Sequence, residues 1–397
     1  MKKSMHKILI LFIHATFFLS CISSSLAQPA SNPGNPFIQN YTTEEYSGGP
    51  QNWAVLQDNR GVMYFGNGQG VLEFDGNNWN LIRMPNNSTV LSLARDSSGT
   101  IYVGAYQEFG YLSADSMGKL TYRSLSANSP WIPKDTVFSE VWTILPTSHG
   151  VYFITESLIF RLENDSIDII PRKSVQHRVI LSGDEIILFY TASDFMVFNT
   201  QGTRDFRFHD ILRVARIFPY NDHSFLALTT NGEFYIATTG TEEDDRAGSE
   251  NNGHTSTCGL EKLQTSVGNW LIENNIYCST VWQDYYIFGT LKGGIIIMDR
   301  QGGTVQTIGT QQGLYNNAVL KLCTDKNNNV WAALSDGISL IETGTPIRKY
   351  DGLSGLKDII LTFAEYGDKL YTGGLNGIYY LPRSGSVLQD GGGNFFL

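Results

Sequence analysis

A ten-residue pattern returns along this chain at a spacing of about 40 residues, which is the length of one small β-sheet unit. Gln57–Gly66 reads QDNRGVMYFG and Arg95–Gly104 reads RDSSGTIYVG, so that the aspartates at 58 and 96 are 38 positions apart. Further copies surround Asp325 and Asp368. In each copy an Asp/Asn/Gly turn precedes an aromatic and β-branched run, followed by a second turn and a second run. A sheet of this size must bury both faces against neighbouring copies.

Weaker copies fill the middle of the chain, and we count eight units between about residues 50 and 382. The stretch that links one copy to the next supplies a fourth strand. The pattern therefore predicts an all-β fold, a β-propeller of four-stranded blades. We expect seven blades to close one ring and the eighth unit to be an extra blade from a truncated second propeller.

The N-terminus has the layout of a secretory signal peptide. Lys2, Lys3 and Lys7 precede an apolar stretch over 8–19, and Ser25-Leu26-Ala27 forms a small-residue cleavage pattern. We therefore expect a signal peptide at 1–27, an N-terminal linker at 28–48, the β-propeller at 49–382 and a truncated tail at 383–397. The chain is then periplasmic or secreted. A lipoprotein anchor at Cys21 is the alternative processing.

Composition excludes several function classes. The formal net charge is −10, and removing 1–27 takes away three lysines and no acid. So acidic a chain, without a basic patch, is a poor partner for nucleic acid. No later stretch reaches the roughly 18 apolar residues of a membrane span. Cys258, Cys278 and Cys323 have no zinc-site spacing, and either one bridge or free thiols is compatible with them.

No cofactor or metal site is predicted. Asp325-x-Asn327-x-Asn329 matches the start of a calcium loop, but Val330 stands where the loop needs glycine. Asp58 and Asp96 hold the same position in their copies, which favours a hairpin turn.

The best copies resemble a known family. Gly313–Val319 followed by Asp325–Ile341 resembles the two-component-regulator propeller repeat, and the opening from Asn35 to Tyr111 resembles the start of three-tyrosine-motif sensors of Bacteroidetes-type bacteria. The resemblance implies a periplasmic ligand-sensing propeller, the N-terminal part of a signal-transduction regulator. In that family an immunoglobulin-like domain, one membrane span and a cytoplasmic output such as a histidine kinase follow. This chain holds none of these, so the resemblance implies no enzyme activity for it, and any homodimer would form through the missing C-terminal regions.

Exposed aromatic rings beside amides are the sequence feature most typical of a sugar site. Trp79 and Trp131 lie in connecting segments, and Asn77 and Asn78 adjoin the first of them. Such rings suit the flat faces of sugars, so a small-molecule or oligosaccharide ligand is the predicted partner. Ordinary packing between blades is the competing interpretation of both tryptophans.

Three functions stay in competition. The first is a periplasmic propeller that senses a ligand, with a glycan as the ligand class considered. The second is a secreted propeller enzyme, a lyase or a glycan-cleaving protein, which would need convergent His, Glu or Tyr side chains in the central channel. The third is a protein-interaction scaffold with a flat apolar or acidic face.

Overall fold

The computed structural model describes residues 34–382 except 128, 173–178, 190, 192, 200–201, 208–212, 222–223, 239–255, 258, 346, 353–354 and 368. The predicted signal peptide, Cys21 and the predicted tail lie outside these residues. The chain divides into two compact units, one of residues 35–349 and the other of residues 1–34 and 350–397.

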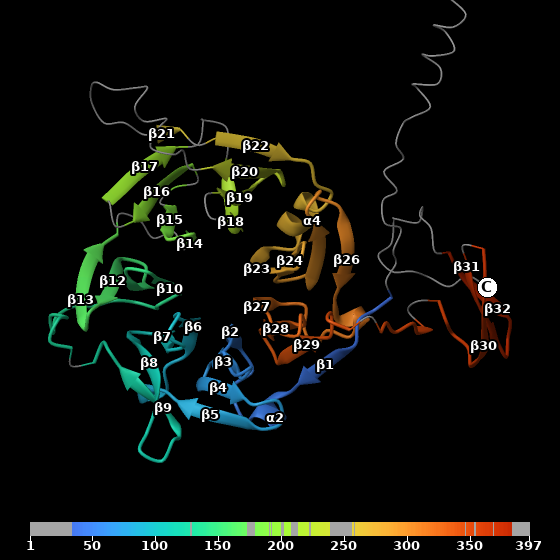
Figure 1. Cartoon of the computed structure of the whole chain (residues 1–397), viewed down its shortest axis with the longest axis horizontal. Coiled ribbons are helices and arrows are strands. Elements are labelled where there is room, and N and C mark those ends of the chain that lie inside the picture. The colour runs from blue at the N-terminus through green and yellow to red at the C-terminus, as the bar shows by residue number, and fades with distance from the viewer. Residues whose placement is uncertain are drawn as a thin grey trace, which may run out of the picture. The chain divides into compact units, whose positions relative to one another are not determined.

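The described part of the 35–349 unit forms seven antiparallel sheets arranged as a ring (Figure 1). We call each sheet a blade and its strand nearest the ring axis the inner strand. The blades, from the inner strand outward, are as follows: blade 1, β2 (Asn52–Gln57), β3 (Met63–Asn67), β4 (Gly70–Phe74), β5 (Trp79–Arg83); blade 2, β6 (Val90–Arg95), β7 (Ile101–Ala105), β8 (Glu108–Ala114), β9 (Leu120–Ser124); blade 3, β10 (Thr143–Thr147), β11 (Gly150–Ile154), β12 (Leu158–Glu163), β13 (Ser166–Pro171); blade 4, β14 (Val179–Ser182), β15 (Glu185–Phe189), β16 (Asp194–Asn199), β17 (Gly202–Arg207); blade 5, β18 (Val214–Asn221), β19 (Ser224–Thr229), β20 (Phe234–Thr238), β22 (Gly259–Leu263); blade 6, β23 (Ile276–Trp282), β24 (Tyr285–Thr290), β25 (Ile295–Asp299), β26 (Thr304–Ile308); blade 7, β27 (Val319–Thr324), β28 (Val330–Leu334), β29 (Ile338–Ile341), β1 (Ile38–Tyr41).

Short elements join the blades. A two-residue strand, β21 (Ser256–Thr257), pairs in parallel with β17 at the outer edge of blade 4. Two α-helices, α2 (Thr43–Tyr46) and α4 (Gly268–Glu273), and two 3-10 turns, Pro85–Asn87 and Thr310–Gln312, lie in the segments that lead into blades 1, 6, 2 and 7.

Apolar clusters fill the junctions between successive blades all the way round the ring. The second strands β3, β7 and β28 are buried along their whole length. The cluster between blades 7 and 1, for example, joins Trp331 and Ile338 to Phe65 and Leu72. Because every described junction has such a cluster, burial of both sheet faces holds the ring together. The predicted propeller fold is confirmed.

The outer strand of blade 7 comes from the other end of the sequence. β1 pairs antiparallel with β29, with Ile38 opposite Ile341 and Tyr41 opposite Ile338. These residues were predicted to belong to the N-terminal linker, because Ile-Gln-Asn-Tyr is short and does not match the repeat pattern. β1 thus closes the ring, because it pairs the N-terminal segment of the ring with blade 7, the last blade in the sequence.

The repeated aspartate does two jobs in each good copy. In Asp325 one carboxylate oxygen accepts the backbone N–H groups of Asn327 and Asn329, both at 2.8 Å. The other oxygen accepts the indole N–H of Trp331 at 3.1 Å. Asp96 bonds the hydroxyl of Tyr102 at 3.1 Å in the same way. Asp325 is therefore a hairpin residue, as predicted, and the six-residue spacing from aspartate to aromatic ring has a physical cause.

The described part of the other unit forms one three-stranded sheet of β30 (Ile360–Tyr366), β31 (Lys369–Gly374) and β32 (Ile378–Pro382). Its small core contains Tyr379 and Leu381. The first strand has the register shift between Ile360 and Thr362 that also occurs in the inner strands of the ring. This sheet therefore has blade geometry and belongs to a unit separate from the seven-bladed ring.

Candidate functional site

The two ends of the ring carry different connections. Within a blade the strands run antiparallel in chain order, so the turns between strands 1 and 2 and between strands 3 and 4 lie at one end. We call this the turn end. The turns between strands 2 and 3 and the segments that join the blades lie at the opposite end, the connection end.

The predicted site residues of blade 1 lie at the turn end. Asn77 and Asn78 are exposed in the β4–β5 turn, where their backbone N–H groups bond Asp75 at 2.8 and 2.7 Å. The ring of Trp79 is half-buried and stacks on Phe74 with centroids 4.4 Å apart. It also contacts Tyr41, Tyr46 and Phe65. Trp79 thus contributes to the junction between blades 7 and 1.

Trp131 lies at the other end of the ring. Its side chain is 52% exposed, in the 125–142 segment between blades 2 and 3. That segment is fixed to the strand 2–3 turn of blade 2, because Gln107 N–H bonds the Ser139 carbonyl at 3.3 Å. Buried Glu108 also holds its start by accepting the Ser126 hydroxyl at 2.8 Å. The structure therefore does not bring Trp131 together with Asn77 and Asn78.

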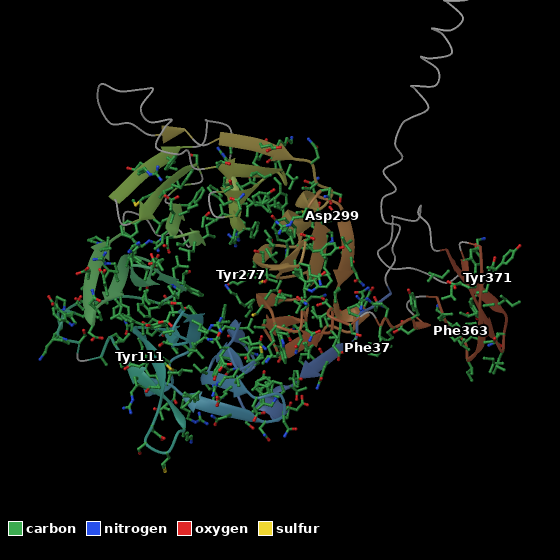
Figure 2. All side chains as sticks on the ribbon, viewed as in Figure 1. Phe37, Tyr111, Tyr277, Asp299, Phe363 and Tyr371 are labelled. Carbon is green, nitrogen blue, oxygen red and sulfur yellow. The ribbon has the colours of Figure 1, made fainter. Side chains whose placement is uncertain are left out.

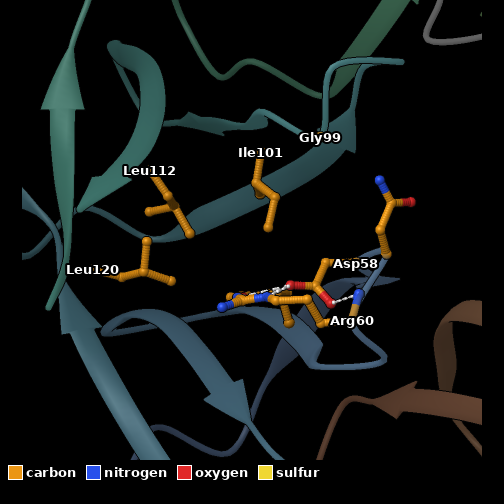
Figure 3. Close-up of a pocket in the computed structure, with 8 residues that line it drawn as sticks. Asp58, Arg60, Gly99, Ile101, Leu112 and Leu120 are labelled. Carbon is orange, nitrogen blue, oxygen red and sulfur yellow. Dashed lines mark hydrogen bonds and ion pairs between the residues drawn. The ribbon is translucent and has the colours of Figure 1, made fainter. Parts of the chain in front are cut away.

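A cavity of about 250 Å³ lies between blades 1 and 2 at the turn end (Figure 3). Ile101, Leu112 and Leu120 form its apolar wall, and Asp58 and Arg60 lie opposite. The polar groups bond one another: Arg60 pairs with Asp58 at 2.8 Å and donates to the Tyr64 hydroxyl at 2.9 Å. Burial, followed by the charges of Glu73 and Asp58, raises the Tyr64 pKa. These groups need no ligand to satisfy them.

A different constellation is built by β-bulges in the inner strands. The register of the inner strand shifts at the same place in blades 1, 2, 5, 6 and 7. A bulge leaves one residue unpaired and turns its side chain away from the ordinary alternation. The residues in question, with the equivalent residue ahead of β10 in blade 3, are Trp53, Leu91, Trp142, Ala215, Tyr277 and Leu320. We call these residues, with one neighbour on each side, the axial layer.

Two indoles of the axial layer meet across an intervening blade. Trp53 of blade 1 and Trp142 of blade 3 have ring centroids 6.1 Å apart in an edge-to-face arrangement. Blade 2 separates their blades, so they contact each other on the axis side of β6. Because both residues stand at the start of an inner strand, the pair lies toward the connection end. The Trp53 indole N–H is buried and has no hydrogen-bond partner.

Hydrogen bonds between blades hold the axial layer in place. The residue after a bulge donates to the carbonyl just before the next blade's axial residue: the Ser92 hydroxyl to Val141 at 2.6 Å, and Arg216 Nε to Ile276 at 3.2 Å. The Cys278 thiol makes the same contact to Val319 at 3.7 Å. The neighbouring blade thus supplies a donor to each of these three carbonyls.

Tyr277 and Arg216 are two of the polar residues of the axial layer. Figure 2 shows Tyr277 at the inner edge of blade 6, beside the centre of the ring. Burial and the Cys278 thiol raise the Tyr277 pKa, while the charge of Arg216 opposes them, so the phenol keeps its proton. Burial raises the Cys278 pKa to about 12 against the charge of Lys321. Cys278 is therefore a packing residue and not a nucleophile.

Trp53, Arg216 and Tyr277 were not predicted as site residues from the sequence. One signal was available: Trp53 and Leu91 are 38 positions apart, the same spacing as the repeated aspartates. The residues five positions ahead of each aspartate were thus identifiable as equivalent. The direction in which their side chains point depends on a β-bulge, and no residue type in the repeat predicts that bulge.

Other chemistry has little support in the described part of the chain. There, no three His, Cys, Asp or Glu side chains are grouped to bind a metal. Cys278 and Cys323 are both free thiols, and Cys258 lies outside the described residues. His149 is exposed in a turn, and the other histidines of the chain lie outside the described residues. Across those same residues no helix has the length and apolarity to span a membrane.

Comparisons with known proteins agree with the propeller architecture. No protein-family profile and no curated protein matches the chain. Among solved structures, the extracellular domain of the hybrid two-component system BT3049 from B. thetaiotaomicron superposes with a TM-score of 0.61 at 16% identity, over 87% of this chain and 48% of that one. The extracellular domain of the hybrid two-component system BT4673 from the same organism gives 0.55 at 13%, over 91% and 47%.

A third similar structure is an enzyme. A streptogramin B lyase superposes with a TM-score of 0.56 at 13% identity, over 78% of this chain and 98% of that one. Identities this low establish the fold alone. The chain spans about half the length of the two regulator domains. The resemblance to the propeller sensor region of two-component regulators, first indicated by the repeats, is thus matched by their solved structures, and the fold is a β-propeller.

Proposed function

We propose that this chain is the periplasmic sensor propeller of a signalling regulator and that it binds a small-molecule or oligosaccharide ligand at the axial layer. The observation that carries the proposal is the contact between Trp53 and Trp142, with the buried, unpaired indole N–H of Trp53. Aromatic faces beside an unsatisfied donor are features of a ligand site.

The N-terminal layout at 1–27 supports export, and the similarity to extracellular regulator domains supports the sensor role. On this proposal the β30–β32 sheet is the first blade of a second propeller, since it repeats the inner-strand bulge. Trp131 is exposed at the connection end and adds a ring on the same side; Trp79, Asn77 and Asn78 are the less favoured part of the predicted site.

A lyase or glycan-cleaving enzyme is the alternative function. The streptogramin B lyase of similar fold favours it. It requires titratable side chains that converge near the axis. In the axial layer as described, Tyr277 is the phenol available for acid–base work, and its raised pKa makes it a poor base at neutral pH. Sensing without turnover is therefore the better-supported function.

The test is a thermal-shift screen of the exported, processed chain against neutral and acidic mono- and oligosaccharides, with divalent ions included. A ligand that binds the folded state raises the melting temperature in a dose-dependent way. Trp53→Phe keeps an aromatic ring but removes the N–H, and it should weaken binding roughly threefold to tenfold.

Trp282→Phe is the matched control. Trp282 also has a buried indole N–H without a partner, but it ends β23 at the turn end. It should leave binding unchanged. If a ligand binds and both variants bind it like the wild type, the axial site is wrong; if a ligand is consumed during the assay, the enzyme alternative gains.

A further inference from the structure

The axial layer differs in charge from the chain that surrounds it. The chain as a whole has a formal net charge of −10. The six described triplets of the axial layer, at 52–54, 90–92, 141–143, 214–216, 276–278 and 319–321, contain two cations, Arg216 and Lys321, and no acidic residue. Glu140 and Arg213 each stand one position before a triplet, and their formal charges cancel. The axial layer is therefore cationic although the chain as a whole is acidic.

Both cations keep hydrogen-bonding capacity. Arg216 uses Nε for the Ile276 carbonyl at 3.2 Å and Nη1 for the Ala215 carbonyl at 3.3 Å. Because a guanidinium carries five N–H donors, the Nη2 pair is left over. Lys321 is exposed, and its charge acts on the thiols of both Cys278 and Cys323. Lys321 thus presents an exposed cation on the inner strand of blade 7.

The groups that surround these cations select a ring-shaped acid. Trp53 and Trp142 offer apolar faces, and the Trp53 N–H and Tyr277 O–H are donors. The layer therefore has many donors, two positive charges and few side-chain acceptors. A ligand that matches it carries a carboxylate, hydroxyl oxygens on several sides and a flat apolar face.

We infer that the axial layer recognises an acidic sugar, a uronate, with its carboxylate at Arg216 and Lys321 and its ring against Trp53 and Trp142. This inference rests on the proposed ligand-binding function and adds the chemical class of the ligand. An aromatic carboxylate shares the charge and the flat face but lacks the hydroxyl oxygens that the Trp53 and Tyr277 donors require.

The experiment compares digalacturonate with galactobiose, which has the same rings without the carboxylates. Isothermal titration of the exported chain should show digalacturonate binding about tenfold or more tightly, as expected for hydrogen bonds to a charged group. Lys321→Gln and 0.5 M salt should each reduce that preference. Lys119→Gln, which removes an exposed cation at the turn end, should not. Benzoate should bind more weakly than digalacturonate.

Three results would overturn the inference, and they separate it from the function on which it rests. Equal binding of the two disaccharides, both weakened by Trp53→Phe, leaves the proposed sensor function standing and refutes the acidic ligand. Benzoate binding as tightly as digalacturonate refutes the sugar. If neither disaccharide binds, and another compound binds tightly with an affinity that Trp53→Phe does not change, both the axial site and the uronate are refuted.

Discussion

A methyl group added to Gly104 tests whether the ring depends on close approach between blades. A Cβ on Gly104 would stand 2.3 Å from the Ser92 hydroxyl and 2.7 Å from a methyl of Val141. Gly66 and Gly289 meet the equivalent valines, Val90 and Val319, at 2.9 and 2.7 Å. The glycine that ends the Tyr-Val-Gly run of the repeat thus makes room for the next blade.

The cost of Gly104→Ala follows from these two contacts. Ser92 must rotate, which breaks its 2.6 Å bond to the Val141 carbonyl and costs about 0.5–1.5 kcal/mol. The overpacked junction costs a further 1–3 kcal/mol or so. Alanine also restricts the unfolded chain, which returns about 0.4–1 kcal/mol. We therefore expect a clear net loss in the free energy of unfolding, measured by urea denaturation.

Gly68→Ala is the control, because a Cβ there has no atom within 4 Å. It should change stability by no more than about 0.5 kcal/mol, apart from the gain through the unfolded chain. In the double variant Gly104→Ala/Val141→Ala the two losses should not add, because the shortened valine makes room for the new methyl. If Gly104→Ala is as stable as Gly68→Ala, close packing of the blades is not what the glycine provides.

Three further predictions concern the ring. Asp325→Ala leaves the buried Trp331 N–H without an acceptor and should cost about 1–3 kcal/mol in urea denaturation, whereas Asp75→Ala, in an exposed turn, should cost less; equal costs would contradict the role assigned to the aromatic partner. Burial alone would raise the Asp96 pKa, but hydrogen bonds from Ser98, Thr100 and Tyr102 outweigh burial and lower it. The stabilisation that Asp96 provides is therefore present above about pH 4 and is lost as the pH falls through the lowered value. Melting temperatures measured from pH 7 to pH 3 should fall less for Asp96→Asn than for the wild type, and parallel curves would refute this. Removing residues 34–41 deletes β1 and should lower the melting temperature of the ring by more than removing 1–33 does; equal melting temperatures would show that β1 does not close it.

The repeat predicted the blades because its turn residues act locally. Asp58, Asp96 and Asp325 bond amide groups two to four residues further along, and this chemistry is visible in any ten-residue window. β1 was not predictable in the same way. Its partner β29 is about 300 residues away, and nothing in Ile-Gln-Asn-Tyr distinguishes a pairing strand from an extended linker.

The tryptophans show the same limit at the level of the site. Trp331, which lies inside the repeat pattern, is 4% exposed and packs between blades 7 and 1. Trp79 was one of two candidate ligand rings, with ordinary packing as the competing interpretation, and Tyr41 of the distant β1 completes the aromatic cluster around it. Residue type and neighbours in sequence could not reveal a contact supplied by a strand whose pairing was itself unpredicted.

The axial layer combines residues from several blades. Any blade could supply one aromatic residue, and one ring on one inner strand has no functional meaning. What joins Trp53 and Trp142 in the proposed site is their contact across blade 2: Trp53 is the bulge residue of blade 1, and Trp142 stands just before β10 in blade 3. A closed ring converts a spacing of about 40 residues in sequence into convergence in space, so each blade can keep its packing residues fixed while its single axial residue varies. Specificity in such a protein should therefore change through the axial residues and their charged neighbours, with the aspartate turns and the junction glycines left as they are.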